Sequence, residues 1–419
     1  ILTTRVVSVT GTPTTADASS TSVQLLRPVE ALNSEPTVSM IVDLAFDPAF
    51  IHEPLIFLSR HGGIGGSGIR IFYYNDQEEV LLSEIDHYFA DQNNPGYNDT
   101  SFEIDLTPLD KIPPANSQLM RIAPPKMLWA FYYPWIAWDQ DASCTDHPSI
   151  PYDYNDDGVR TSETFAKQIE QAQSAGIDGF IVSWVDDETL NQNLSLLLDA
   201  AQEKGFFIAI YLESTPDPND RTVHPEIITD WLAYAIPEFG DHPAYMQLNG
   251  KPLIVVYNSS AAPLETWQTI FADLDTRGDF ASYIGMSYTL TDLSLFDGLH
   301  QYAIIGIPDL LSVYQSVSRG VRYYSLLSDT EQQKIFVATV QPGFDDCPYH
   351  PPTTDLLMER NNGDYYRSTF EAAIQSNPDW IIITSWNEFG ETTHIEPSDF
   401  FGTQYLEITR EFAERWKSP

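Results

Sequence analysis

The stretch AGIDGFIVSWVDDETLNQNLSLLLDAAQEKGFFIAIYLE, residues 175–213, contains a strand, a helix and a second strand in close succession. GFIVSW (179–184) and FFIAIYLE (206–213) are almost continuous apolar runs, as is typical of strands buried on both faces. Residues 189–204 between them carry apolar side chains at helical spacing. This alternation predicts two neighbouring strands of a parallel sheet, joined by a helix that covers the sheet.

The same alternation continues from about residue 126 to the end of the chain. Strand candidates lie at 127–133, 179–184, 206–213, 252–258, 283–288, 298–304, 336–340 and 380–386, and helical patterns at 161–175, 189–204, 225–236, 264–274, 364–376 and 402–416. Thr161 or Ser162 is a candidate cap for the first helix. Eight strands predict a (β/α)₈ barrel, the TIM-barrel fold, over residues 125–419. TLTDLSLFD, before the sixth strand, is too short for a good helix, so one unit is expected to be degenerate.

Residues 1–124 have a different pattern. β-branched and apolar runs such as TVSMIVDLAF and GIRIFYY alternate with turn clusters such as GGIGGSG and DQNNPGYND. Several short strands separated by such turns predict an all-β, sandwich-like accessory domain. The four prolines of KIPPANSQLMRIAPPK indicate a boundary between this domain and the barrel.

The charge balance limits the partners. The chain has 21 Lys and Arg against 60 Asp and Glu, a formal net charge of −39. Nucleic acids and anionic membranes bind basic surfaces, so neither is an expected partner, and a strongly anionic glycan is disfavoured as well. No apolar run approaches the ~18 residues of a membrane-spanning helix, and we expect no membrane span.

The chain begins at Ile1 and contains two cysteines, Cys144 and Cys347. A start without Met indicates either a removed targeting segment or a trimmed chain, and a secreted, periplasmic or cell-surface location is the expectation. The cysteines follow the first and seventh strands, on the same face of the predicted barrel, and they fit no zinc-ligand spacing. Only the eighth strand separates these two strands in a closed barrel, so a disulfide between their loops is one expectation and two free thiols are the alternative.

One segment matches part of a calcium-binding loop. DYNDDG, residues 153–158, has the D-x-N-x-D-G pattern of its first half. The twelfth position, where a bidentate carboxylate is needed, is Thr164. A solvated turn is the alternative interpretation, and no metal or other cofactor is expected.

Barrel enzymes carry their active sites at the carboxyl ends of the strands. Here the last strand is followed by SWNEFGETTHIEPS, which contains Glu388, Glu391 and Glu396. Two carboxyl groups are what glycoside hydrolysis requires, and flat aromatic side chains suit the C–H faces of sugars. Loop carboxylates that only cap a helix are the alternative for the first two, and Glu396 is expected to support the loop. The substrate-binding candidates at strand ends are Tyr133, Trp135, Trp184, Glu213, Tyr257, Tyr302, Asp345, Asn387 and His394; the aromatic ones can instead belong to the core.

Several motifs in the barrel half occur in the order of a known family. They are AFYYPW (130–135), AGIDGFIVSW (175–184), NGKPLIVVY (249–257), PGFDD (342–346) and the long stretch at 360–398. Over about residues 126–416 the chain resembles glycoside hydrolase family 99, the endo-α-mannosidases. The resemblance implies Glu388 as the base that deprotonates the sugar's 2-hydroxyl, and Glu391 as the acid that protonates the leaving oxygen. It also implies a 1,2-anhydro sugar intermediate, retention of configuration, and an α-mannoside-like linkage in a glycan or polysaccharide.

The sequence departs from the family pattern beside the two glutamates. Phe389 stands where Trp is usual, Thr392 where Gly is common and His394 where Gln is common, and the loop after YYPW lacks a Gly-x-Pro. These positions border the sugar site and are expected to affect which sugar is accepted. The long loops at the mouth are rich in Tyr, Trp and Asp, which predicts a groove and therefore internal cleavage of a chain.

Two other functions fit a barrel of this family. A surface-polysaccharide biosynthesis protein would need a nucleotide-sugar site with basic or metal-binding groups, and no such motif is found. A non-catalytic glycan-binding protein would be expected to lack one glutamate, whereas both are present. The N-terminal domain either binds carbohydrate or braces the barrel, and its sequence leaves both open.

Overall fold

The fold is taken from a computed structural model that describes residues 124–134, 144–155, 159–215, 221–327, 334–349 and 356–418, together with six strands among the first 88 residues. The chain divides into two compact units. One comprises residues 1–121, 289–291 and 306–331, and the other comprises the remainder. The predicted division at residue 124 stays a prediction.

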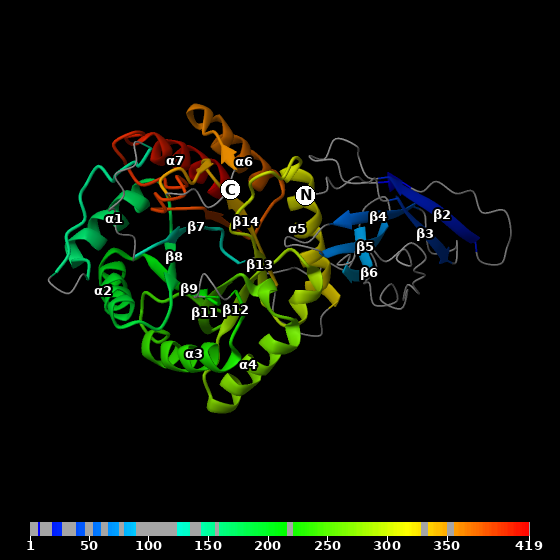
Figure 1. The fold of residues 1–419 in the computed structure, drawn as a ribbon, viewed down its shortest axis with the longest axis horizontal. Helices are drawn as coiled ribbons and strands as arrows, with labels where there is room; N and C mark the ends of the chain where they lie inside the picture. The colour runs from blue at the N-terminus through cyan, green and yellow to red at the C-terminus, as the bar shows by residue number, and fades with distance from the viewer. Residues whose placement is uncertain are drawn as a thin grey trace. The chain divides into compact units, whose positions relative to one another are not determined.

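Eight parallel strands form a closed barrel in the second unit (Figure 1). They are β7 (Met127–Tyr132), β8 (Gly179–Trp184), β9 (Phe207–Glu213), β11 (Lys251–Tyr257), β12 (Ser282–Met286), β13 (Gly298–His300), β14 (Ile335–Val340) and β17 (Trp380–Ile383). Each pairs with the next in this order, β17 pairs with β7, and β11 pairs with β9. The ring therefore has no free edge, and the predicted (β/α)₈ barrel is confirmed.

Alternate residues of the strands fill the barrel. On β7 the inward positions are Met127, Trp129 and Phe131, each at most 5% exposed, and Tyr133 continues the series past the strand's end. Neighbouring strands contribute Ile181, Ala209, Tyr211, Leu253, Val255, Ile284, Ile335, Val337, Trp380 and Ile382. Gly179 makes room for this packing, because a Cβ there would lie 2.3 Å from a ring carbon of Trp129. The interior is a packed core, which leaves the ends of the barrel for a site.

Helices surround the ring of strands, as Figure 1 shows for α1 to α4, α6 and α7. Their bounds are α1 Ser162–Ser174, α2 Glu188–Lys204, α3 Pro225–Phe239, α4 Leu264–Arg277, α6 Asp364–Gln375 and α7 Gln404–Lys417. Thr161 caps α1 by accepting a hydrogen bond from the Thr164 N–H, as predicted, and Gly205 ends α2 in the left-handed conformation. Among the described residues, no helix is both long and apolar enough to cross a membrane.

The connections differ from the predicted pattern in two places. Between β12 and β13 a short 3₁₀ helix, Leu290–Ser294, replaces an α-helix, which confirms the degenerate unit. Between β13 and β14 lies α5 (Leu310–Leu327), which was not predicted. Its sequence, LLSVYQSVSRGVRYYSLL, contains a glycine and three valines, all poor helix formers, so local propensity hides the helix.

Two strands end several residues earlier than predicted. β13 stops at His300 and β17 at Ile383, whereas apolar residues continue for several positions. After β17 the N–H of Ser385 donates to the Thr393 carbonyl in the following loop, at 2.8 Å. The chain therefore leaves the sheet at the point where the predicted site begins.

The described strands of the first unit are antiparallel throughout. They are β1 (Val7–Ser8), β2 (Ser19–Leu26), β3 (Ser39–Phe46), β4 (Glu53–Ser59), β5 (Gly66–Tyr74) and β6 (Glu79–Tyr88). One sheet has the order β1-β4-β5-β6, and β2 pairs with β3. The predicted β structure is present, and its packing as a sandwich stays a prediction.

Candidate active site

The loop after β17 folds back on itself at the carboxyl end of the barrel. The Ile395 N–H donates to the Trp386 carbonyl at 3.0 Å, and the Glu396 N–H donates to the same carbonyl at 2.9 Å. Within the loop, the Glu388 N–H donates to Ser385 Oγ at 2.8 Å. These bonds close residues 385–396 into a compact loop, hereafter the glutamate loop. Glu388 and Glu391 lie between its two ends.

Asn387 fastens the glutamate loop to β7. The Tyr133 N–H donates to Asn387 Oδ1 at 2.8 Å, and Asn387 Nδ2 donates to the Tyr133 carbonyl at 2.9 Å. The side chain is fully buried. Its amide therefore acts on the protein backbone, and its predicted contact with substrate stays a prediction.

Glu388 and Glu391 each accept a hydrogen bond from a tyrosine of a neighbouring loop. The Tyr302 hydroxyl, beyond β13, lies 2.9 Å from Glu391 Oε2. The Tyr349 hydroxyl, beyond β14, lies 3.3 Å from Glu388 Oε1. Both tyrosines hold a carboxyl group at the mouth, and only Tyr302 was predicted from the sequence.

The surroundings favour the protonated form of both glutamates. Burial raises the pKa of Glu388 well above its ordinary range, and the nearby carboxylates of Glu391 and Glu213 raise it further. Burial also raises the pKa of Glu391, and Asp346 adds to that effect. Like charges in one buried site resist simultaneous ionisation, so the pair retains a proton above the pH at which free glutamate loses it.

Glu213, at the end of β9, belongs to the same charged group. Ser183 Oγ donates to Glu213 Oε1 at 2.6 Å. Burial raises the pKa of Glu213 to about 7, and Glu391 contributes to the rise. The structure thus brings three predicted glutamates from two strand ends into one electrostatic site.

An aromatic layer caps the barrel core at this end. The rings of Tyr211 and Tyr257 meet edge to face at 5.7 Å, and those of Tyr257 and Tyr302 at 6.3 Å. Phe131 packs 4.4 Å from Tyr211, and His300 lies 5.6 Å from it. Burial lowers the pKa of His300 to about 4, so the imidazole is neutral at physiological pH. The layer is largely uncharged, which is consistent with the raised pKa values of the glutamates.

One predicted sugar platform, Trp184, lies in the packing of the protein. Trp184 is 1% exposed, its Nε1 donates to Asn191 Oδ1 at 2.8 Å, and its ring meets Trp231 edge to face. The structure therefore places Trp184 within the packing between β8, α2 and α3. Trp135 lies outside the described residues.

The side chains that depart from the family pattern make contacts with other residues of the protein. His394 is buried, lies 2.9 Å through Nε2 from Asp146 Oδ2, and stacks on Phe389 with ring centroids 3.9 Å apart. Thr392 Oγ1 donates to the Asp345 carbonyl at 2.8 Å. Asp345 Oδ1 in turn accepts the Cys347 N–H at 2.9 Å. These side chains join the glutamate loop to the loops after β7 and β14.

Glu396 lies at the base of the glutamate loop, as expected for a supporting residue. Its carboxyl group accepts hydrogen bonds from the Tyr152 hydroxyl and, at 2.9 Å, from Gln168 Nε2 on α1. The guanidinium of Arg160 lies 4.2 Å from the centre of the Tyr152 ring. Burial raises the pKa of Glu396 to about 7.

A disulfide joins Cys144 to Cys347, with the Cα atoms 6.2 Å apart. This confirms that the loops after β7 and β14 meet at the mouth.

Three residues of the site, Tyr349, Asp146 and Arg160, were not predicted from the sequence. The signal for Tyr349 was its place two residues after Cys347, at the end of the extended motif PGFDDCPY.

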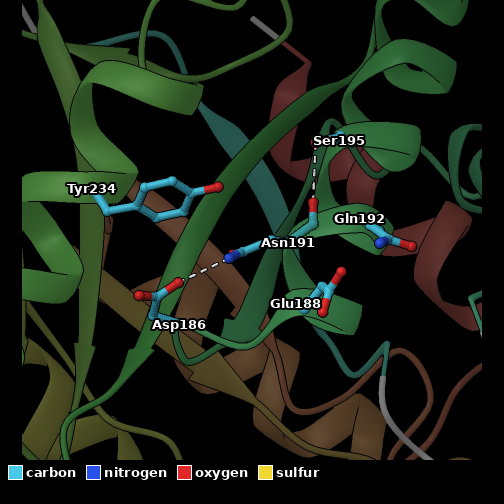
Figure 2. A pocket seen from close by; sticks show the side chains of 6 residues that line it. All are labelled: Asp186, Glu188, Asn191, Gln192, Ser195 and Tyr234. Carbon is cyan, nitrogen blue, oxygen red and sulfur yellow. Dashed lines mark hydrogen bonds between the residues drawn. The ribbon is translucent and has the colours of Figure 1, made fainter.

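An open groove of about 370 Å³ lies beside the amino end of α2 and the face of α3. Its lining residues are Asp186, Glu188, Asn191, Gln192, Ser195 and Tyr234. Figure 2 shows Asp186 accepting a hydrogen bond from Asn191, at 2.8 Å, below the Tyr234 ring. None of the mouth glutamates lines this groove, so it is distinct from their site.

The segment that matches half of a calcium-binding loop is described only in part. The Asp153 N–H donates to Thr164 Oγ1 at 3.0 Å, and residues 156–158 lie outside the described ranges. Thr164 thus bonds the start of the turn through its hydroxyl. Within the described part of the chain, no group of three or more His, Cys, Asp or Glu residues could hold a metal ion.

Comparison with known proteins places this site in a family. An endo-α-mannosidase structure of glycoside hydrolase family 99 from Bacteroides thetaiotaomicron matches with 26% identity and a TM-score of 0.58, over 69% of this chain and 97% of that one. Glycoprotein endo-alpha-1,2-mannosidase from Rattus norvegicus is 26% identical, and a related zebrafish protein, glycoprotein endo-alpha-1,2-mannosidase-like protein from Danio rerio, is 29% identical.

The similarity covers most of the barrel unit. The matched region is 61% of this chain and 61% of the rat protein, and 66% and 67% for the zebrafish pair. The family model for glycosyl hydrolase family 99 matches residues 137–410, which include β8 to β17 and both glutamates of the loop. The chain therefore belongs to glycosyl hydrolase family 99.

Proposed function

We propose that the protein is a retaining glycoside hydrolase that cleaves α-mannoside-like linkages within a glycan or polysaccharide. One observation carries the proposal: Glu388 and Glu391 lie together at the carboxyl end of the barrel, each hydrogen-bonded by a tyrosine hydroxyl. The names of the relatives supply the linkage class. A buried pair of carboxyl groups suits the two proton transfers of glycoside hydrolysis.

In the first step Glu388 acts as the base and Glu391 as the acid. The Glu388 carboxylate takes the proton of the sugar's 2-hydroxyl, whose oxygen attacks the anomeric carbon. Glu391 donates its proton to the departing glycosidic oxygen as that bond breaks. The products of the step are a 1,2-anhydro sugar and the released part of the glycan.

In the second step water opens the anhydro ring. Glu391, now ionised, takes a proton from the water as its oxygen attacks the anomeric carbon. Glu388 returns its proton to the sugar's O2. Two displacements at the anomeric carbon give net retention, and both glutamates regain their starting protonation.

The electrostatics of the site favour a state in which Glu388 and Glu391 together hold one proton. The step needs one ionised and one protonated glutamate, and burial, reinforced by the nearby carboxyl groups, raises the pKa of both glutamates. Tyr302 donates a hydrogen bond to Glu391, and Tyr349 donates one to Glu388. Each tyrosine thereby orients the carboxyl group to which it donates.

The substrate-binding roles remain part of the proposal. Glu213 and Tyr257 lie beside the pair, and we assign them contacts with sugar hydroxyls and a sugar face. The loops after β7, β14 and β17 meet at the mouth through the disulfide and the bonds of the glutamate loop. Long loops at a barrel mouth suit an internal stretch of glycan, and on this ground we propose endo action.

Replacement of the glutamates tests the proposal. Glu388→Gln and Glu391→Gln should each lower kcat by a factor on the order of 10² or more, because positioned acid–base groups contribute 10²–10⁴. Both variants should melt at no lower temperature than wild type and still bind an α-mannoside oligosaccharide by calorimetry. Glu265→Gln, an exposed change on α4, is the matched control. Undiminished turnover in either variant would remove that glutamate from the reaction.

A modified substrate tests the route. An oligosaccharide with a 2-O-methyl group on the reacting sugar should bind but not be cleaved, because its O2 cannot lose a proton and attack. Proton NMR of the unmodified reaction should show retained configuration in the first product. Rapid cleavage of the methylated substrate, or an inverted product, would contradict the anhydro-sugar route.

The disulfide supports a location. Disulfides persist in oxidising compartments and are rare in reducing ones. We infer that the protein works outside the cytoplasm, in a secreted, periplasmic or cell-surface setting. Fractionation of the source cells tests this, and recovery of the active protein from the cytoplasm alone would contradict it.

A further inference from the structure

The loop after β14 places one tyrosine against the base of the proposed reaction. The Tyr349 hydroxyl is 3.3 Å from Glu388 Oε1, and the Tyr349 N–H donates to the Asp346 carbonyl at 3.0 Å. The turn at 346–349 therefore aims the tyrosine at the glutamate. The backbone N–H of Gly390 also donates a hydrogen bond to the Glu388 carboxyl group.

Gly390 provides the space for this contact. A Cβ at Gly390 would lie 2.4 Å from the Tyr349 hydroxyl oxygen and 2.5 Å from the ring carbon that bears it. Separations under about 3 Å do not occur between such atoms, so any larger residue at this position would push the ring away. The phenol thus fits against the glutamate loop only because residue 390 has no side chain.

The segment that carries Tyr349 is held on both sides. Cys347 is bonded to Cys144, two residues before the tyrosine. The Asp345 N–H donates to the Glu391 carbonyl at 2.9 Å, and Thr392 Oγ1 donates to the Asp345 carbonyl at 2.8 Å. The loop after β14 is therefore tied to the glutamate loop and to the loop after β7, which limits movement of the ring.

We propose that Tyr349 is a positioning residue for the reaction: its hydroxyl holds the Glu388 carboxylate in the orientation that takes the proton of the substrate hydroxyl, and Gly390 makes that contact possible. The inference rests on the proposed function of Glu388. It deepens that function, because it assigns a role to a side chain from outside the glutamate loop.

The proposal predicts the direction of a pH effect. The titratable groups that face Glu388 are Glu391, Glu213, Tyr133, Tyr302 and Tyr349. Of these the Tyr349 hydroxyl donates a hydrogen bond that stabilises the ionised form, which lowers the pKa of Glu388 against the effects of burial and of the carboxylates. Loss of the hydroxyl therefore raises the pKa of Glu388, and the base becomes ionised only at higher pH.

The test is the pH dependence of kcat/KM for Tyr349→Phe, with Tyr234→Phe on the outer face of α3 as the matched control. The acidic limb should move up by about 1 pH unit or more, since a hydrogen bond to a charged group is worth at least that much. Below the limb kcat should fall more than KM changes. The control should keep the wild-type profile.

Gly390→Ala is the second variant, because it displaces the phenol without removing it. It should shift the acidic limb in the same direction, and Tyr349→Phe/Gly390→Ala should shift it no further than the larger single change. A wild-type acidic limb in Tyr349→Phe, with folding verified by its melting temperature, would overturn the inference while leaving the proposed function intact. A wild-type enzyme that cleaves no glycoside, or full activity in Glu388→Gln, would instead defeat the proposed function.

Discussion

At the scale of single residues, Glu396 is a buried carboxyl group at the base of the glutamate loop, held by hydrogen bonds. It is buried and accepts hydrogen bonds from Tyr152 and Gln168, while the nearby positive charge of Arg160 favours ionisation. Burial outweighs these effects and raises the pKa of Glu396 from 4.5 to about 7. The group therefore prefers the neutral form in the folded protein over a pH range in which the unfolded chain ionises it.

This shift predicts how stability depends on pH. The folded pKa is raised, so the contribution of Glu396 is fully present below about pH 4.5 and is lost as the pH rises through about 7. Glu396→Gln keeps a neutral side chain of the same shape and lacks this loss. Relative to wild type, the free energy of unfolding of the variant should rise by about 3 kcal/mol between pH 4.5 and pH 8. Urea unfolding at both pH values measures it.

The control for this prediction is Glu265→Gln on the exposed first turn of α4. Its difference from wild type should be the same at both pH values. If the difference for Glu396→Gln were also independent of pH, burial would not govern the protonation of this carboxyl group.

At the scale of elements, the glutamate loop depends on contacts with the loop after β7. His394 bonds Asp146 at 2.9 Å, and both side chains are 1% exposed. Burial lowers the pKa of His394 to about 4, so at neutral pH a neutral imidazole donates to an ionised Asp146. The Phe389 ring stacked on His394 completes the contact. Two of the residues that depart from the family pattern, Phe389 and His394, thus pack together with Asp146.

A double-mutant cycle tests this unit. His394→Ala and Asp146→Ala should each lower the free energy of unfolding by about 2–3 kcal/mol, because each leaves a buried polar partner unsatisfied. The double variant should lose clearly less than the sum. The exposed pair His242 and Asp199, 3.4 Å apart, is the control, with an expected coupling below about 1 kcal/mol. Additive losses at His394 and Asp146 would show that the two do not act together.

The elements were more predictable than the contacts between them. Six helices and all eight strand positions follow from apolar periodicity, because a surface helix is apolar along one stripe and a buried parallel strand is apolar on both faces. Past a strand's end the periodicity stops. Trp184 was therefore predicted as a sugar platform, ahead of Tyr302, and only tertiary packing places it against Trp231. Tyr349 lies in a loop whose path is set by the disulfide and the glutamate loop, so its place after PGFDDCP marks it as a neighbour of the site but does not show which group it contacts.

At the scale of the whole molecule, the closed ring of strands explains why residues distant in sequence meet. β17 pairs with β14 on one side and with β7 on the other. The loops after these three strands therefore leave the barrel side by side, and they carry Tyr349, the glutamate loop and Asp146. The formal net charge of −39 is also a property of the whole molecule. That this charge excludes nucleic acid as a partner remains a prediction.

The last prediction concerns the disulfide. Cys144 and Cys347 are 203 residues apart, so their bond closes a large loop in the unfolded chain and restricts that chain strongly. The chain-entropy relation gives about 5 kcal/mol for a loop of this size. The variant Cys144→Ser/Cys347→Ser should therefore melt at a clearly lower temperature than wild type. A phosphine reductant should lower the wild-type melting temperature toward that of the variant and leave the variant unchanged. Two free thiols by mass spectrometry in unreduced protein would refute the bond. Because Tyr349 lies two residues from Cys347, the reduced enzyme should also show part of the pH shift expected of Tyr349→Phe, which connects the stability of the fold to the alignment of its base.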